Sequence, residues 1–353
     1  MKKMKRILSA VIAVCMIAAL IPGCGKKTEI VDSITVFNYG QYIDPEVLDI
    51  FTEETGIEVK YEEATTPEEL YTKYKAGAID YDVLCTSDYM LERLINEGEL
   101  QEIDQSSMEY VENIGDKYWE FSKSFDSENK YTIPYFWGTV GILYDTTKVK
   151  EPIDSWDVLF NHEYSGEIVM QNSMRDSFMV AEKYLGYSLN TENADEINAA
   201  KELLLEQKAD VQAYLVDEAR DEVVAGNATM AIIYSGEAYL GREYNEDLAY
   251  VVPKEGSNVW LDSWGITKDS QHAESATKFL DFLCREDIAR MNFDYIYYST
   301  PNDAVFENLS EEELADEILV PSDESIANCE VYKQTSAETT DLMNNQWKEI
   351  KAE

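Results

Sequence analysis

The stretch ITVFNYGQYIDPEVLDIFTEETGIEVKYE, residues 34–62, decides the fold class. It opens with a β-branched and aromatic run, 34–38, which predicts a strand. The tripeptide Asp-Pro-Glu at 44–46 combines an N-cap, a proline at N1 and an acid in the first turn, so we expect a helix from there until Gly56 ends it. A second strand is expected after the glycine. The stretch therefore predicts one strand–helix–strand unit.

The same order of elements continues along the chain. The sequence TPEE at 66–69 repeats the helix-start signal with a capping-box acid, and we expect a strand over 81–86 and a helix over 89–98. This alternation is typical of a parallel sheet with right-handed crossovers, in which ligands bind beyond the carboxyl ends of the strands. Polar and tyrosine-rich loops, 38–42 and 87–89, follow two of these ends and are candidates for a site.

The later part of the chain predicts a second α/β segment. Residues 131–144 are expected to form two strands broken at Gly138, and 273–292 a single long amphipathic helix. Further strands are expected over 167–171, 211–214, 230–234, 248–252 and 259–266, and further helices over 177–185, 195–206, 218–225, 311–317 and 339–352. Because no spacer rich in proline, glycine or serine separates the two segments, we expect two lobes joined by extended chain.

Residues 1–23 are expected to be a signal peptide rather than part of the fold. The start MKKMKR is basic, and the apolar run 7–21 is too short for an ordinary membrane-spanning helix. Gly23 directly before Cys24 resembles a bacterial lipobox, which implies cleavage before Cys24, lipid attachment to that residue and a tether over 24–33. A plain signal peptide with a chance cysteine is the alternative.

The composition narrows the possible functions. With 29 basic and 70 acidic residues the chain has a net charge of −41, which argues against a nucleic-acid partner, because that affinity comes from lysine and arginine on phosphates. A negative field instead concentrates cations. Only two histidines and no Cys-x-x-Cys are present, which leaves little for a zinc site or a serine–histidine–aspartate triad. We expect no metal and no cofactor.

The stretch VWLDSWGI at 259–266 is the strongest candidate for a binding surface. In a strand, Trp260, Asp262 and Trp264 point to the same face. A carboxylate flanked by indole rings suits an organic ammonium, because it offers charge-assisted hydrogen bonds and cation–π attraction. The alternative is a buried strand with two core tryptophans.

Several motifs in this order resemble one family. They are NYGQY (38–42), YDVLCTSDY (81–89), IPYFWG (133–138), WLDS (260–263) and YSTPN (298–302). The chain resembles the extracytoplasmic solute-binding proteins of polyamine ABC importers, of the spermidine/putrescine type, over nearly all of its mature length. The resemblance implies a two-lobed, type II periplasmic-binding-protein-like α/β fold with a ligand cleft between the lobes. Residues 34–136 and 262–300 are expected to form one lobe, and 137–261 and 301–353 the other.

The resemblance also implies the site residues, position by position. The expected ligand-binding residues are Tyr39, Tyr42, Ser87, Asp88, Tyr89, Asp176, Tyr234, Glu237, Trp260, Asp262, Tyr298 and Tyr332. The family often has tryptophan where Tyr39 stands. Three further positions depart from the family pattern: Ser173 stands where the family carries an acid, Tyr234 replaces a tryptophan, and Tyr332 replaces a glutamine. Asp88 and Glu237 stand beside matched positions and are the candidates to replace the missing carboxylate. Trp264 is left out of the site as a core residue.

The expected function is capture of a polyamine without chemistry. The resemblance implies delivery to an ABC permease driven by a separate ATPase, by a monomer that is held to the extracytoplasmic membrane face through its lipid. Two alternatives stay open. One is a binding protein for another organic cation or solute. The other is a lipid-anchored hydrolase that uses Asp176 and Asp262 as acid and base.

Overall fold

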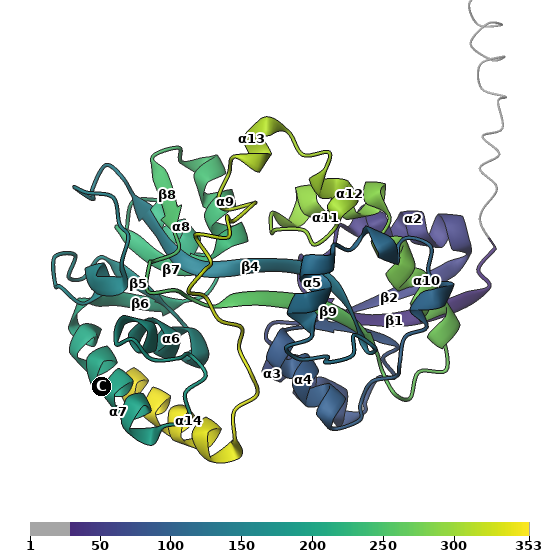
Figure 1. The fold of residues 1–353 in the computed structure, drawn as a ribbon, viewed down its shortest axis with the longest axis horizontal. Helices are drawn as coiled ribbons and strands as arrows, with labels where there is room; N and C mark the ends of the chain where they lie inside the picture. Colours follow the sequence, from purple (N-terminus) through teal and green to yellow (C-terminus); the bar gives the residue numbers. More distant parts are fainter. Residues whose placement is uncertain (1–28, 353) are drawn as a thin grey trace, which may run out of the picture.

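The computed structural model describes residues 29–352, and one nine-stranded sheet runs through both halves of the molecule (Figure 1). The strands lie in the order β2-β1-β3-β9-β4-β7-β5-β6, and β8 pairs with β4. Their bounds are β1 (Asp32–Tyr39), β2 (Ile57–Ala64), β3 (Val83–Thr86), β4 (Thr132–Asp145), β5 (Ile168–Gln171), β6 (Val211–Leu215), β7 (Met230–Tyr234), β8 (Leu248–Val251) and β9 (Val259–Ile266).

Helices cover the sheet in each half. Their bounds are α2 (Pro45–Thr55), α3 (Pro67–Ala76), α4 (Asp88–Asn96), α5 (Asp116–Ser122), α6 (Met174–Tyr184), α7 (Ala194–Gln207), α8 (Glu218–Val224), α9 (Ser235–Tyr244), α10 (Ala273–Leu283), α11 (Glu286–Ile296), α12 (Asp303–Phe306), α13 (Glu311–Leu314) and α14 (Ala337–Ala352). Short 3₁₀ turns lie at Gln105–Ser107, Val111–Asn113, Trp156–Leu159 and Lys208–Asp210.

The first half forms as its local signals predict. The Asp44 side chain accepts a hydrogen bond from the Glu46 amide at the start of α2, and Gly56 ends that helix with a φ of 75°. This left-handed conformation favours glycine. β1 pairs in parallel with both β2 and β3, as a sheet with crossover helices requires. The predicted parallel sheet of this half is confirmed.

β4 and β9 connect the two halves of the molecule. The first half is built on β1, β2 and β3, and the second on β5, β6, β7 and β8. β9 pairs antiparallel with β3 of the first half and with β4, and β4 continues into the second half, where it pairs antiparallel with β7 and β8. In the second half β5 pairs in parallel with β6 and β7. Figure 1 shows these two long strands crossing the middle of the molecule. Extended chain rather than a flexible spacer therefore links the lobes.

Two predicted elements were wrong. Residues 131–144 do not break at Gly138, because β4 runs through it; a Cβ there would lie 2.6 Å from the Ser235 Oγ and from the Trp260 ring, so the glycine serves close packing. The predicted helix 273–292 is two helices, α10 and α11, because Arg285 has an extended backbone with ψ of 134°.

Each half has its own hydrophobic core. One buried cluster gathers side chains of β1, β3, α10 and α11, a second gathers side chains of β5, β7 and α6, and a third gathers side chains of β5, β7 and α8. Val305, Leu309 and Leu319 pack into the first cluster, although the predicted boundary at residue 301 assigned them to the second lobe. Ile318 of the same segment packs into a cluster of the second half, so this segment contacts the cores of both halves. The predicted division into lobes stays a prediction.

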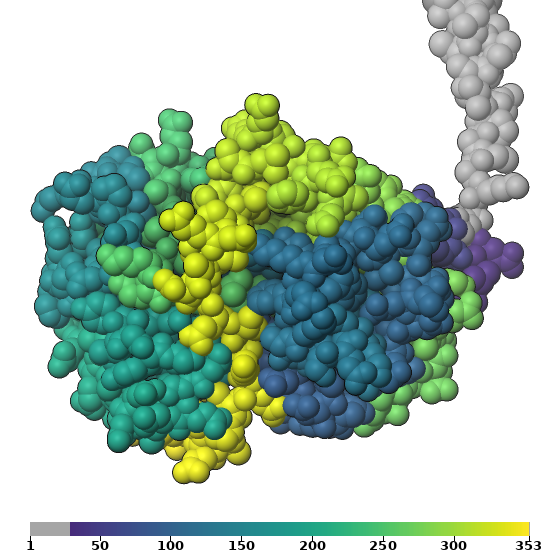
Figure 2. Space-filling model, viewed as in Figure 1, coloured from purple at the N-terminus to yellow at the C-terminus, as the bar shows by residue number. Residues whose placement is uncertain are grey.

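The C-terminal segment returns along the boundary between the halves before α14 packs on α7. Figure 2 shows this segment, in yellow, running down between the two halves. We call residues 328–336 the C-terminal strap.

Among residues 29–352, no helix combines the length and apolarity that crossing a membrane requires. The predicted signal peptide and Cys24 lie outside the described residues.

Candidate ligand-binding site

Five aromatic rings from four segments form a continuous wall where the halves meet. Edge-to-face contacts join Tyr39 to Tyr42 (5.8 Å between ring centroids), Tyr42 to Tyr298 (6.0 Å) and Tyr298 to Trp260 (4.9 Å). Trp260 in turn meets Tyr234 at 6.3 Å. These rings come from the end of β1, the turn after α11, β9 and the end of β7. The structure thus brings together residues that are far apart in the sequence.

Asp176 lies at one end of this wall. It is 3 % exposed, and both of its carboxylate oxygens accept tyrosine hydroxyl hydrogen bonds, from Tyr234 at 2.9 Å and from Tyr332 at 3.0 Å. Ser173 caps α6, because its Oγ accepts from the Asp176 amide at 3.3 Å. The residues at the three departing positions therefore all contact Asp176.

Asp262 and Asp88 lie near the first-half end of the wall. Asp262 is 8 % exposed, and burial raises its pKa to about 7. Asp88 is fully buried at the start of α4, and its Oδ1 accepts the Tyr89 amide at 2.7 Å. Burial, and after it the charge of Asp262, raise the pKa of Asp88 well above the usual value. The negative charge of Asp262 therefore disfavours ionisation of the buried Asp88.

Among the described residues, four buried polar atoms at this place have no partner that meets ordinary hydrogen-bond geometry. They are the Tyr42 hydroxyl, the Ser87 Oγ, the Asp88 Oδ2 and the Trp260 Nε1. Buried polar groups in native proteins are nearly always hydrogen-bonded, to protein or to a bound molecule. The hydroxyl and carboxylate oxygens among them can accept a hydrogen bond from an ammonium, whereas the indole N–H can only donate. Together with two carboxyl groups and an aromatic wall, they make this place the candidate ligand site.

A family model described as a bacterial extracellular solute-binding protein matches residues 46–321 of this chain. The chain belongs to the bacterial extracellular solute-binding proteins. The family places this solute-binding protein outside the cytoplasm.

Its relatives carry more specific names. The chain is 33 % identical over 326 residues to the spermidine/putrescine-binding periplasmic protein of Escherichia coli, covering 91 % of this chain and 92 % of that one. Among solved structures, the spermidine/putrescine ABC transporter substrate-binding protein PotD of Streptococcus pneumoniae matches with a TM-score of 0.82 and 36 % identity, over 91 % of this chain and 99 % of that one.

A putative spermidine/putrescine ABC transporter structure from Listeria monocytogenes matches with a TM-score of 0.84 and 34 % identity, over 90 % of this chain and 98 % of that one. The predicted resemblance and the periplasmic-binding-protein-like α/β fold are confirmed.

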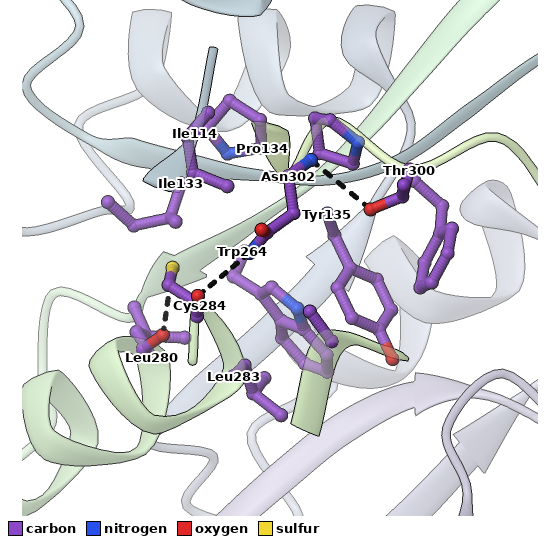
Figure 3. A pocket seen from close by; sticks show the side chains of 13 residues that line it. Ile114, Ile133, Pro134, Tyr135, Trp264, Leu280, Leu283, Cys284, Thr300 and Asn302 are labelled. Atoms are coloured by element: carbon purple, nitrogen blue, oxygen red, sulfur yellow. Dashed lines mark hydrogen bonds between the residues drawn. The ribbon is translucent and has the colours of Figure 1, made fainter. Parts of the chain in front are cut away.

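Trp264 of this solute-binding protein lies away from the site, as expected. Its ring meets Tyr135 at 5.0 Å and Phe279 at 5.9 Å, inside the core of the first half. Figure 3 shows Trp264 beside Tyr135 among the residues that line a small pocket. The cavity there is about 10 Å³, which holds at most one water molecule. Trp264, two residues after Asp262 in β9, therefore belongs to the core and not to the candidate site.

Glu237 has a partner within the protein. On α9, its Oε2 accepts a hydrogen bond from Arg220 Nη1 of α8 at 2.6 Å. The positive charge of Arg220 offsets the negative charge with which Glu237 would attract a ligand ammonium. The structure therefore gives little support to Glu237 as the replacement carboxylate, whereas Asp88 has an oxygen free.

Tyr39 and Tyr89 use their hydroxyl groups within the protein. The Tyr39 hydroxyl pairs with Thr86 Oγ1 at 2.9 Å, and the Tyr89 hydroxyl donates to Glu68 Oε1 at 2.8 Å. Ser87, the N-cap residue of α4, makes no side-chain capping bond.

No sequence pattern indicates the contacts that position Tyr332. The guanidinium of Arg175 lies 4.3 Å from the centroid of the Tyr332 ring and donates to the Lys333 carbonyl. On the other side the Tyr332 ring meets Tyr89 at 6.3 Å, and the Gln334 amide donates to Glu92 Oε2 at 2.7 Å. The C-terminal strap therefore contacts both halves next to the candidate site.

Among residues 29–352, no group of three or more histidine, cysteine, aspartate or glutamate side chains is arranged to hold a metal ion.

Proposed function

We propose that this protein binds a linear polyamine, putrescine or spermidine, between its lobes and delivers it unchanged to the permease of an ABC importer. The observation that carries the proposal is the aromatic wall around Trp260 with Asp262, Asp88 and Asp176 along it. The names of the relatives support the same ligand class and the same partner. The protein acts as a monomer in this proposal.

The residue types suit a methylene chain that carries protonated amines. Each aromatic face contributes about 0.5–2 kcal/mol through cation–π attraction, and each hydrogen bond to a charged partner contributes about 1.5–3 kcal/mol. Burial adds about 0.8 kcal/mol per methylene. Association and ordering cost about 4–15 kcal/mol. The balance is consistent with a Kd near the micromolar range, which corresponds to about −8 kcal/mol.

The proposed mechanism is closure of the lobes around the ligand. A polyamine that contacts Asp262 of β9 and Asp176 of α6 has partners in both halves only when the lobes are closed, so it binds that state more tightly and shifts the population towards it. The closed form is then the one that the permease accepts, and a separate ATPase drives transport.

Calorimetric titration of the protein from Lys26 onward tests the function directly. We expect saturable one-to-one binding of putrescine or spermidine, and no binding of arginine or maltose. Silence with putrescine, spermidine and spermine would refute polyamine binding. Binding of arginine or maltose instead would assign the protein to another solute class.

The pH dependence of binding follows from Asp262. Its ionised form holds an ammonium, and its pKa near 7 means that protonation removes that partner as the pH falls. Burial also raises the pKa of Asp88 well above its usual value, so Asp88 titrates in the same direction. Tyr39, Tyr42, Tyr298 and Cys85 stay neutral because burial raises the pKa of each well above its usual value. We expect the affinity to weaken by about tenfold from pH 8 to pH 6, as measured by calorimetry. A flat profile would contradict this assignment.

We further propose that residues 1–23 are removed and that Cys24 carries lipid, which holds the protein at the extracytoplasmic face of the membrane. The support is the basic start, the short apolar run and Gly23 before Cys24. Metabolic labelling with a radioactive fatty acid checks this. Label should enter the wild-type protein and be missing from Cys24→Ala, which should be released from the membrane fraction. Equal labelling of both would contradict the anchor.

A further inference from the structure

Tyr297 has a backbone conformation that its residue type does not favour. It is the C-cap residue of α11, with φ of 65° and ψ of 18°, and its amide donates to the Phe293 carbonyl at 3.1 Å. A left-handed residue at the end of a helix is usually glycine, because a Cβ is crowded in that conformation. Such strain persists only where the surrounding structure holds it. The side chain of Tyr297 must therefore make contacts that hold this conformation.

The Tyr297 ring stacks on a tyrosine of the other half. Its partner is Tyr239 of α9, with 5.5 Å between the ring centroids and 22° between the ring planes. α11 packs in the core of the first half, whereas α9 packs on β4, β7 and β8 in the second half (Figure 1). Tyr239 itself packs against buried clusters of both halves. The stack therefore crosses the boundary between the halves.

Arg242, one turn further along α9, extends the same contact. Its guanidinium lies 5.5 Å from the centroid of the Tyr239 ring and forms an ion pair with Asp316, which follows α13. A guanidinium at this distance is attracted to the ring. α9 is thus joined to residues 297 and 316 by side chains outside the aromatic wall.

α9 also meets the residue that follows Tyr297. A Cβ on Gly236 would lie 2.6 Å from the Tyr298 ring, so only glycine permits this close approach. Tyr298 belongs to the aromatic wall, through its contact with the indole of β9 at 4.9 Å. The carbonyl of the next residue, Ser299, accepts an amide of β4 at 3.0 Å. The turn that carries Tyr298 is therefore held by α9 and by β4.

Resting on the proposed function, we propose that Tyr297 and Tyr239 are positioning residues for polyamine capture: their stack forms only when the lobes are closed, stabilises that state and holds Tyr298 in the aromatic wall. A contact that exists in the closed state alone raises the fraction of the protein that is competent to hold ligand. Because neither tyrosine belongs to the aromatic wall, the stack raises the affinity for every polyamine by the same factor.

Calorimetry with putrescine and spermidine on Tyr239→Ala and Tyr297→Gly tests the inference. Each variant should bind every polyamine that the wild type binds about three- to tenfold more weakly, which is the worth of one aromatic pair, and by the same factor within twofold. The double variant should bind at most twofold more weakly than the weaker single variant, because the two rings form one contact. Tyr297→Phe keeps the ring and should bind within twofold of wild type.

Thermal unfolding of the ligand-free protein separates this role from a purely structural one. Tyr297→Gly relieves the left-handed strain, so its Tm should equal or exceed that of wild type even though its affinity falls. Tyr239→Ala gives an independent measurement that leaves the turn after α11 unchanged in sequence. Tyr244→Ala removes an exposed ring from the same helix, α9, and should bind as wild type does.

Each other result has a defined meaning. Wild-type affinity in Tyr239→Ala and Tyr297→Gly, or additive losses in the double variant, would overturn the role of the stack while leaving polyamine binding in place. A coupling between the two residues that appears in the Tm and not in the affinity would do the same, because the stack would then be a permanent part of the fold. Binding of no polyamine by the wild type would instead refute the proposed function.

Discussion

Asp262→Asn is expected to weaken polyamine binding by about 10- to 100-fold at pH 8, because it removes a charged hydrogen-bond partner from a site that is 8 % exposed. The amide keeps the shape of the carboxyl group, so the fold should remain. Calorimetry with the preferred polyamine measures the loss. The weakening between pH 8 and pH 6 should also be smaller in the variant, since Asp262 no longer titrates. An affinity within twofold of wild type would remove Asp262 from the site.

The same substitution should stabilise the ligand-free protein at high pH. Burial raises the folded-state pKa of Asp262 from 3.8 to about 7, so the folded state binds more protons than the unfolded state between these values. Wild-type stability therefore falls as the pH rises through that window, and the variant escapes this loss. We expect a Tm a few degrees above wild type at pH 8, where 1 kcal/mol corresponds to about 2 °C, and no difference near pH 4. A lower Tm at pH 8 would contradict the burial argument.

Trp260→Ala is expected to weaken polyamine binding by about 10- to 100-fold. The indole joins the rings of Tyr298 and Tyr234 and lies on Gly138, so its removal opens the wall at its centre. The loss combines cation–π attraction of about 0.5–2 kcal/mol with the burial of ligand methylenes. Titration calorimetry measures the change, and Trp260→Phe should fall between wild type and Trp260→Ala.

Because Trp260 also belongs to the core of the second half, the alanine variant loses stability as well. Trp260→Phe keeps an aromatic ring and a folded core, so its affinity remains interpretable. Tyr244→Ala, at a tyrosine that is 69 % exposed, is the matched aromatic control and should bind as wild type does. Wild-type affinity in both Trp260 variants would show that the indole serves the core alone.

Sequence alone determined the elements whose signals are local. Helix α2 begins and ends at its own capping residues, Asp44 and Gly56, because caps and left-handed glycines act within one turn of the chain. The alternation of strands and helices predicted the parallel sheet of the first half. The motif WLDS, with the resemblance it carries, pointed to Trp260 and Asp262, which the structure places together with the aromatic residues from the other motifs.

Only the tertiary structure decided which of these side chains have a partner already. Tyr234 and Tyr332 both bind Asp176 from positions 58 and 156 residues away, and Arg220 of one helix pairs with Glu237 of the next. Gly138 continues a strand instead of breaking it because Trp260 packs on it. Such contacts depend on how separate elements meet in space, and no local pattern records them.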